Sequence, residues 1–440
     1  MTVPRHTFAW KLGAAAITFL AVLLSLQMLR GSTPTPSPGE AAISARGAAL
    51  PGASTDDRVE ALQAQVEDTP SDPEGYGQLG LAYLQKARES GDSSFYTKAE
   101  GVFQQALSLD AENFTATSGL GSLALGRHDF RKALELGRTA RRSNPTIARN
   151  YGVIADAQIE LGRYAAAERT LQRWVDLKPE LSSYARVSYF RELNGDLRGA
   201  LEAMRLAVSA GGESTENFSY VETLVGNLQL QRGAYAKAER AYRAVLESDP
   251  EYAPAIAGLA RLRAGRGDLD AAIRMYRGVV EVLPLPEYVV ALGEAEEAAG
   301  RLAAARRDYE LVAAQIELLE ANGVDTDVDL ALFEADHGNR DRAVVLGRRA
   351  WRAAPSVRSA DAYSWALSRA GHTHAALRLS HEAMRLGSRD PSFLYHAGTI
   401  AERAGRRAKA RALLSRLLVQ SPRFRPLYAP RARAALEELG

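Results

Sequence analysis

Residues 230–250, LQRGAYAKAERAYRAVLESDP, carry the pattern that decides the fold. Gly233 and Pro250 are helix breakers, because glycine loses more backbone freedom than any other residue and proline lacks an N–H donor. Between them, Ala238 and Tyr242 lie four residues apart and so share one face of a helix. The stretch therefore predicts a tight turn at the glycine, followed by an amphipathic helix that stops at the proline.

The pattern returns with a period of 34 residues. In residues 263–284, RAGRGDLDAAIRMYRGVVEVLP, Gly267, Ala272 and Tyr276 each lie 34 residues after their counterparts. It occurs earlier in residues 161–179, LGRYAAAERTLQRWVDLKP. Further glycines lie five residues before an alanine, at Gly195, Gly300, Gly338, Gly371 and Gly405.

On these residues the chain resembles the tetratricopeptide-repeat family, whose 34-residue unit is a helix-turn-helix. The resemblance covers residues 73–422 and implies an all-α fold, a right-handed superhelical solenoid of about ten helix pairs. We assign residues 57–426 to the solenoid, with its first helix near residues 57–67. A capping helix is expected in residues 427–440, because the last unit must cover its apolar face.

Three units depart from the period. The marker glycines are 38 residues apart between Gly195 and Gly233, and again between Gly300 and Gly338. The first unit is stretched by ARESGDSSF at residues 87–95. These insertions are predicted to form either loops or longer helices.

Composition excludes several kinds of function. The 440 residues are 46% hydrophobic and 25% charged, with a net charge of +2, which does not indicate nucleic acid as a partner. The absence of cysteine excludes disulfides, thiol nucleophiles and cysteine-based zinc sites. The abundance of Arg, Ala and Gly over Lys indicates a GC-rich bacterial genome.

Residues 12–29, LGAAAITFLAVLLSLQML, form an uncharged apolar run. As a helix the run is about 27 Å long, close to a hydrocarbon core of about 30 Å. We predict a transmembrane anchor. A cleaved signal peptide is the alternative, but Arg30 and a proline-rich stretch follow the run in place of a small-residue cleavage site.

Basic residues before the anchor place residues 1–11 in the cytoplasm and the solenoid outside. The expected location is therefore a bacterial cell membrane crossed once. Residues 30–56, rich in Pro, Gly and Ala, are predicted to be a linker that holds the repeats away from the bilayer. A proline-binding motif is the alternative for the same stretch.

No phosphate loop, nucleophile elbow, zincin helix or dinucleotide fingerprint is present, so we predict no enzyme and no cofactor. The glycine-rich GLGSLALG at residues 119–126 falls within a predicted helix and indicates close packing. Acids in residues 325–336 resemble the start of a calcium loop, but Leu330 stands where the turn needs glycine, so they are predicted to cap a helix.

Two charged clusters have competing interpretations. Four of the seven histidines fall within 25 residues, which makes a metal site conceivable and polar surface the favoured interpretation. Residues 406–433 are basic, which fits either attraction to anionic partners or ordinary solvated helix faces. The weak metal candidates are His372, His374, His381 and His396.

The resemblance implies that first helices line a concave groove that grips peptides or helices. By register, this groove includes Asp156, Tyr189, Asn227, Arg261, Glu294 and Trp365. The predicted function is a non-catalytic scaffold, anchored in the membrane, that binds other proteins. Because residues 59–84 resemble the opening of repeat domains in bacterial cytochrome c assembly factors, an assembly chaperone of an envelope complex is the alternative. A metal-binding accessory protein and an appended catalytic domain are further alternatives, although almost no sequence remains for the latter.

Overall fold

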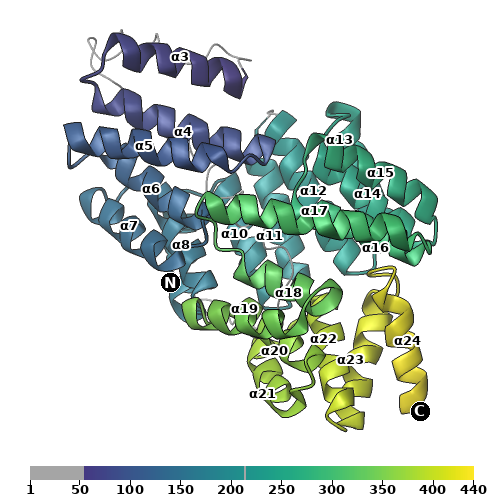
Figure 1. The fold of residues 1–440 in the computed structure, drawn as a ribbon. Coiled ribbons are helices and arrows are strands. Elements are labelled where there is room, and N and C mark those ends of the chain that lie inside the picture. The colour runs from purple at the N-terminus through teal and green to yellow at the C-terminus, as the bar shows by residue number, and fades with distance from the viewer. Residues whose placement is uncertain (1–53, 213–214) are drawn as a thin grey trace, which may run out of the picture.

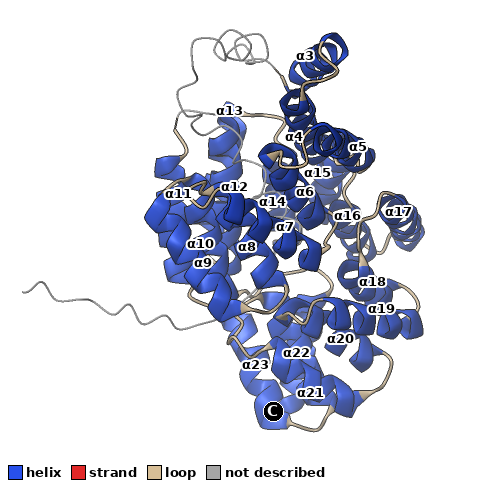
Figure 2. Ribbon diagram, turned by 90° about the vertical axis from the view of Figure 1, so that its left-hand side faces the viewer, coloured by secondary structure: helices blue, strands red, loops and turns tan. Residues whose placement is uncertain are grey.

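The computed structural model describes residues 54–212 and 215–440. These residues form 22 α-helices and no strand, which confirms the all-α prediction (Figures 1 and 2). The predicted cytoplasmic tail, the anchor and residues 30–53 of the linker lie outside the described residues. Within the described ranges, no helix combines the length and hydropathy needed to span a bilayer.

Twenty of the helices form ten consecutive pairs. The first helices of the pairs are α4 (Pro73–Ser90), α6 (Phe114–Gly126), α8 (Arg149–Glu160), α10 (Leu181–Leu193), α12 (Thr215–Gln231), α14 (Ala253–Gly265), α16 (Pro286–Ala298), α18 (Asp327–His337), α20 (Val357–Arg369) and α22 (Pro391–Arg403). The second helices are α5 (Ser94–Leu109), α7 (Phe130–Ser143), α9 (Tyr164–Leu177), α11 (Leu197–Ala210), α13 (Tyr235–Ser248), α15 (Leu269–Val282), α17 (Leu302–Ala321), α19 (Arg340–Ala353), α21 (Thr373–Ala383) and α23 (Arg407–Gln420).

Two more helices flank the pairs, α3 (Thr55–Asp68) before them and α24 (Tyr428–Leu439) after them. They lie at opposite ends of the molecule (Figure 1). In α24, Tyr428, Ala429, Ala432 and Leu439 are buried. This helix therefore covers the apolar face of the last pair, and α3 does the same for the first with Leu62 and Val66.

Large and small side chains alternate between neighbouring first helices. The ring of Tyr242 on α13 is fully buried, and it lies so close to Gly226 and Gly258 that a Cβ atom at either glycine would be 2.4–2.5 Å from it. Gly119 contacts Phe103 in the same way, so the GLGSLALG stretch packs against the preceding pair. The glycines thus allow an aromatic ring to fill the space between two pairs.

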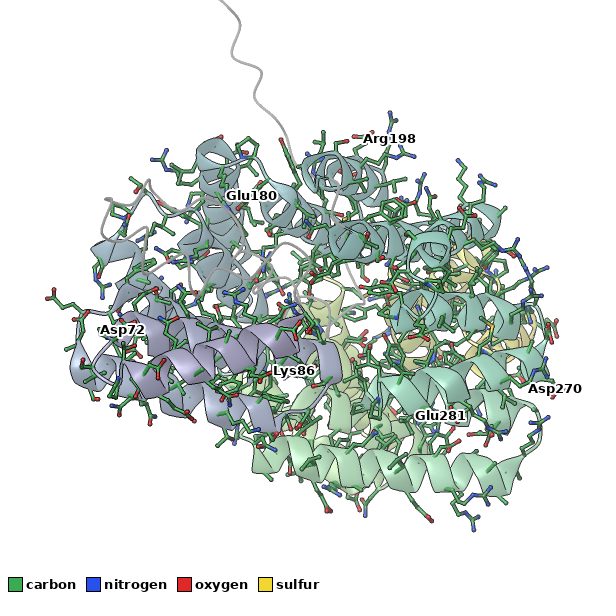
Figure 3. All side chains as sticks on the ribbon, turned by 90° about the horizontal axis from the view of Figure 1, so that it is seen from above. Asp72, Lys86, Glu180, Arg198, Asp270 and Glu281 are labelled. Atoms are coloured by element: carbon green, nitrogen blue, oxygen red, sulfur yellow. The ribbon has the colours of Figure 1, made fainter. Side chains whose placement is uncertain are left out.

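The first helices lie inside and the second helices outside. In α8, eleven of the twelve residues are buried, whereas α9 buries only Ala167, Thr170, Leu171 and Trp174. Charged side chains on second helices, such as Arg198 and Asp270, project into solvent (Figure 3). A helix buried all round needs neighbours on every side, and first helices find them because the chain of pairs is curved.

Successive turns of this curved chain touch along a line of contacts, which we call the seam. The Tyr164 hydroxyl accepts a hydrogen bond of 2.8 Å from the Val357 amide, 193 residues away. Gln420 donates a bond of 2.9 Å to the Gln231 carbonyl across 189 residues. Because these separations are close to a multiple of the repeat length, one turn contains about six repeats of 34 residues.

Two of the departures from the repeat period lie at the seam. The insertion in residues 87–95 includes Ser93, whose hydroxyl accepts a bond of 3.1 Å from the Asn322 side chain. Asn322 follows α17, which is 20 residues long where α13 has 14. Arg127 also donates to the Asn322 carbonyl at 2.9 Å. A lengthened second helix thus joins two turns of the superhelix.

Candidate functional site

Three of the six predicted groove residues line one cavity, which we call the interior cavity. Asn227, Arg261 and Glu294 come from α12, α14 and α16, three consecutive first helices. The loop at residues 421–426 closes the opposite side. The cavity has a volume of about 270 Å³. The repeat register thus brings three side chains, each about one repeat apart, into one place.

Arg261 is the uncommitted cation of the interior cavity. Its side chain is open to solvent within the cavity while protein surrounds it, and it forms no ion pair with any described residue. This enclosure opposes the charge, but the neighbouring Tyr276 and Tyr242 outweigh it and raise the pKa of Arg261. A guanidinium in this setting offers several N–H donors to an incoming acceptor.

Glu287 lies at the same cavity and is open to solvent there. The surrounding protein raises the pKa of Glu287 to about 7, Asp329 raises it further, and Arg261 partly offsets both. Glu287 is therefore half protonated near neutral pH. It can accept or donate a hydrogen bond, which suits a polar surface that contacts protein groups.

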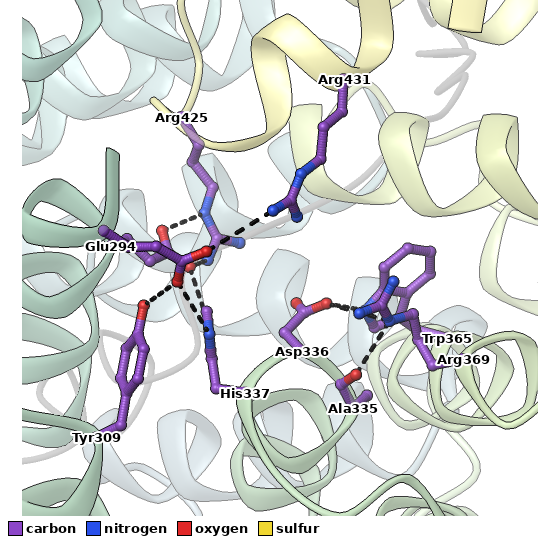
Figure 4. Close-up of polar contacts among 10 residues, drawn as sticks. Glu294, Tyr309, Ala335, Asp336, His337, Trp365, Arg369, Arg425 and Arg431 are labelled. Carbon is purple, nitrogen blue, oxygen red and sulfur yellow. Dashed lines mark hydrogen bonds and ion pairs between the residues drawn. The ribbon is translucent and has the colours of Figure 1, made fainter. Parts of the chain in front are cut away.

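Glu294 is already paired within the chain (Figure 4). Arg425 binds both of its carboxylate oxygens, one of them through Nε at 3.0 Å, and His337 Nε2 lies 3.3 Å from Oε1. Burial opposes the charge of Glu294, but Arg425 and His337 outweigh it and lower the pKa to about 2. Glu294 thus holds the C-terminal segment against α16, 131 residues earlier.

Trp365 also lies inside, and it is 1% exposed. Its indole N–H donates to Asp336 at 3.0 Å, and the Arg369 guanidinium lies over its ring (Figure 4). The His396 ring stacks on the indole with 4.3 Å between ring centroids. Trp365 therefore packs the interior, and only a rearrangement would expose it to a partner.

Asp156 and Tyr189 lie in a second buried cluster. Arg186 Nε contacts both carboxylate oxygens of Asp156 at 2.9 Å, and the Tyr189 hydroxyl donates to Glu160 at 3.2 Å. Burial raises the pKa of Asp156 to about 6, although Arg186 opposes the shift. The two predicted groove residues thus connect α8 to α10 within the fold.

Several of these contacts share one spacing. Asp156 and Arg186 are 30 residues apart, and Asp336 and Trp365 are 29. Because neighbouring first helices are about one repeat apart, polar residues at this spacing meet on the inner surface. Sequence reasoning missed Arg186, Arg425 and Glu287. The first could have been found from the spacing, but Arg425 meets Glu294 only through the curvature of the whole chain.

The structure does not assemble the candidate histidines. His372, His374 and His381 are exposed on or beside α21, while His396 is buried and lies 2.8 Å from an Asp361 oxygen. No group of three or more His, Cys, Asp or Glu residues in the described ranges is placed to hold a metal ion.

The acidic stretch and the basic segment both form internal contacts. Asp327 lies in the first turn of α18 and pairs with Arg349, so this stretch is helical. At the basic end, Arg407 and Arg411 donate to the last carbonyls of α24. Part of the basic charge is therefore used within the fold, where it satisfies helix-end carbonyls.

Curated relatives share part of the chain. Cellulose synthase 1 operon protein C of Komagataeibacter xylinus is 26% identical over 226 residues, which are 50% of this chain and 14% of that protein. The BBSome complex member BBS4 of Bos taurus is 30% identical over 168 residues, 37% of this chain and 31% of that protein. The chain thus spans less than a third of the length of these relatives.

Among solved structures, a TPR protein of Thermus thermophilus is 20% identical with a TM-score of 0.36, covering 47% of this chain and 99% of that one. PilW, a type IV pilus biogenesis factor, is 20% identical with a TM-score of 0.37, covering 48% and 98%. Two family models, both described as tetratricopeptide repeat, match residues 229–292 and residues 84–148, 119–182 and 364–423, together about half of the chain. The chain belongs to the tetratricopeptide-repeat family.

Proposed function

We propose that this protein is a non-catalytic scaffold that binds a segment of a partner protein at the interior cavity. The observation that carries the proposal is Arg261, a cation that faces a 270 Å³ cavity and has no ion-pair partner among the described residues. Asn227 and Glu287 lie beside it and offer amide and carboxyl groups for hydrogen bonds. Tetratricopeptide repeats are interaction modules, and one relative is described as a member of a complex.

The partner segment is expected to present an acceptor, such as a carboxylate or a carbonyl, to Arg261. A charge-assisted hydrogen bond of this kind contributes about 1.5–3 kcal/mol, so its loss weakens binding by a factor of ten or more. Glu294 is excluded as the main contact, because Arg425 and His337 already occupy its oxygens.

Site-specific photocrosslinking in the native host tests the proposal. A photoreactive residue replaces Arg261 in one strain and Arg274, which is exposed on the outer helix α15, in another. We expect a protein to be captured from position 261 only. Purified partner should then bind Arg261→Ala at least tenfold more weakly than the wild type, and Arg274→Ala within twofold. Equal capture from both positions, or equal affinity, would contradict the proposal.

We also propose that residues 12–29 anchor the protein, with the repeats on the outer side of the membrane. The support is the apolar run and the basic residues before it. Alkaline phosphatase fused after Gly440 should be active, and a cytoplasmic reporter at the same place should be inactive. The opposite result would reverse the topology, and release of the fusion into the soluble fraction would support cleavage instead.

A further inference from the structure

A second cavity lies at the seam, between α6–α8 of one turn and α18–α20 of the next. We call it the seam cavity. Its volume is about 310 Å³, at the small end of the range of about 300–1,000 Å³ for small-molecule sites. Phe130, Val328 and Ala350 form apolar walls, and Arg358, Glu160 and Asp329 bring charge to it. The seam cavity shares no lining residue with the interior cavity, so a ligand here is independent of a partner bound there.

Arg358 is a buried cation without a close acceptor. Its side chain is 8% exposed, and its nitrogens lie 3.7 Å from a Glu160 oxygen and 4.0 Å from an Asp329 oxygen. No described residue accepts a hydrogen bond from it. A guanidinium carries five N–H donors, and burial without acceptors destabilises a protein. The geometry therefore leaves donors available to a molecule within the cavity.

Other charges around the seam cavity are committed elsewhere. Arg127 pairs with Glu100 at 2.6 Å, and Arg131 donates to the Ala353 carbonyl at 3.1 Å. Arg186 binds Asp156. Arg358 thus lies as one guanidinium between two carboxylates, those of Glu160 and Asp329. A cation and an anion within 4 Å of each other suit a molecule that carries both charges on neighbouring atoms.

His128 supports the view that this corner is a built site. It has φ of +61°, and no other non-glycine residue in the described ranges has a positive φ. Gly162 and Gly233, at the equivalent turns of other repeats, adopt the same left-handed conformation. A histidine there is strained by its Cβ atom. Its Nδ1 lies 2.6 Å from the Asp325 carbonyl, and its ring stacks on Phe130, so the residue fixes a wall of the cavity.

We propose that the seam cavity binds a free α-amino acid with an apolar side chain. The carboxylate of the ligand would accept from Arg358, and its ammonium would donate to Glu160 and Asp329. The side chain would lie against Phe130, Val328 and Ala350. Since these residues come from both turns, the ligand bridges the seam and strengthens its closure.

Calorimetric titration of the full-length chain in detergent tests the proposal. L-leucine and L-phenylalanine are the probes. N-acetyl-L-leucine lacks the ammonium and L-leucinamide lacks the carboxylate, so each should bind at least tenfold more weakly than L-leucine. Absence of heat with all twenty amino acids would overturn the proposal. So would equal binding of the two analogues, or binding of inorganic phosphate in competition with leucine.

Variants locate the binding. Asp329→Asn removes one of the two anions at a side chain that is 42% exposed, so the fold is expected to remain intact. Leucine affinity should fall at least tenfold with an unchanged circular dichroism spectrum. Asp270→Asn on the outer helix α15 is the matched control and should bind as the wild type does. Unchanged affinity in Asp329→Asn would overturn the site.

Discussion

At the scale of single residues, Ala238 shows why the repeat demands a small side chain. It is fully buried and belongs to one cluster with Tyr242, Val245 and Leu262. Tyr242 fills the space that the glycines of two first helices leave open. Because the interior is close-packed, a longer side chain at position 238 has no room.

Ala238→Arg is therefore expected to lower the free energy of unfolding by more than about 3 kcal/mol, because it forces both volume and an unpaired charge into the core. Ala236→Arg, two residues earlier and exposed on the same helix, is the matched control and should change stability by less than about 0.5 kcal/mol. Thermal and urea denaturation followed by circular dichroism measure both. Similar melting curves for the two variants would argue against this packing.

Glu192 is a buried acid on α10, and Gln231 is the hydrogen-bond partner that affects its titration. Burial raises its pKa to about 7, and Gln231 opposes the shift. An acid with a raised pKa binds more protons in the folded state than in the unfolded state between its two pKa values. Its contribution to stability is thus greatest at low pH and is lost as pH rises through about 7.

Glu192→Gln should remove this penalty. Above pH 7 the variant is expected to be more stable than the wild type by about 3 kcal/mol, and the difference should shrink as pH falls toward 5. Urea unfolding at pH 5, 6, 7 and 8 gives the difference between the two proteins, which isolates Glu192 from Glu287 and Asp156. A constant difference across this range would show that Glu192 is not protonated on folding.

At the scale of elements, polar contacts about one repeat apart join neighbouring first helices. Asp156 on α8 and Arg186 on α10 are both buried, and each is the main partner of the other. A buried pair is costly to break, since removing one partner leaves an uncompensated charge. Such contacts orient the first helices relative to one another in addition to their apolar packing.

Asp156→Leu is expected to lower the free energy of unfolding by about 3–5 kcal/mol. Adding Arg186→Met should recover most of that loss, because the double variant contains no unpaired charge. Glu202→Ala, which breaks the exposed pair with Arg198 on α11, should cost about 0.5 kcal/mol or less. Denaturant titration of the four proteins provides the comparison. Additive losses in the double variant would disprove direct coupling.

The helix pairs could be predicted from the sequence because the turn glycines, the small residues and the terminal prolines recur locally. The interior cavity was anticipated in part, since Asn227, Arg261 and Glu294 follow the repeat register. The role of Glu294 could not be, because Arg425 reaches it across 131 residues. Contacts at that distance depend on the curvature of the chain, which small differences in each helix crossing accumulate, and no short motif encodes it.

At the scale of the whole molecule, the seam explains a difference between two turn glycines. Gly233 and Gly267 both have positive φ, at 72° and 85°. A Cβ atom on Gly233 would be 2.1 Å from the Gln420 carbonyl on the neighbouring turn, whereas one on Gly267 would meet nothing within 4 Å. The two positions therefore share the same backbone demand but only one touches the seam.

Gly267→Ala should cost about 1 kcal/mol, the strain of an alanine in the left-handed region. Gly233→Ala should cost more than this and also separate the turns, so that the radius of gyration from small-angle X-ray scattering increases. An unchanged radius in Gly233→Ala, or an equal increase in Gly267→Ala, would show that the seam is not held at this position.

The lengthened helix α17 and its contact with Ser93 have a mechanical meaning for a chain held at one end. An open superhelix extends under any small load, because each crossing angle yields a little. With its turns fastened to each other, this one keeps its length until the fastening ruptures, and then elongates abruptly. The insertions turn a soft spring into one with a yield point.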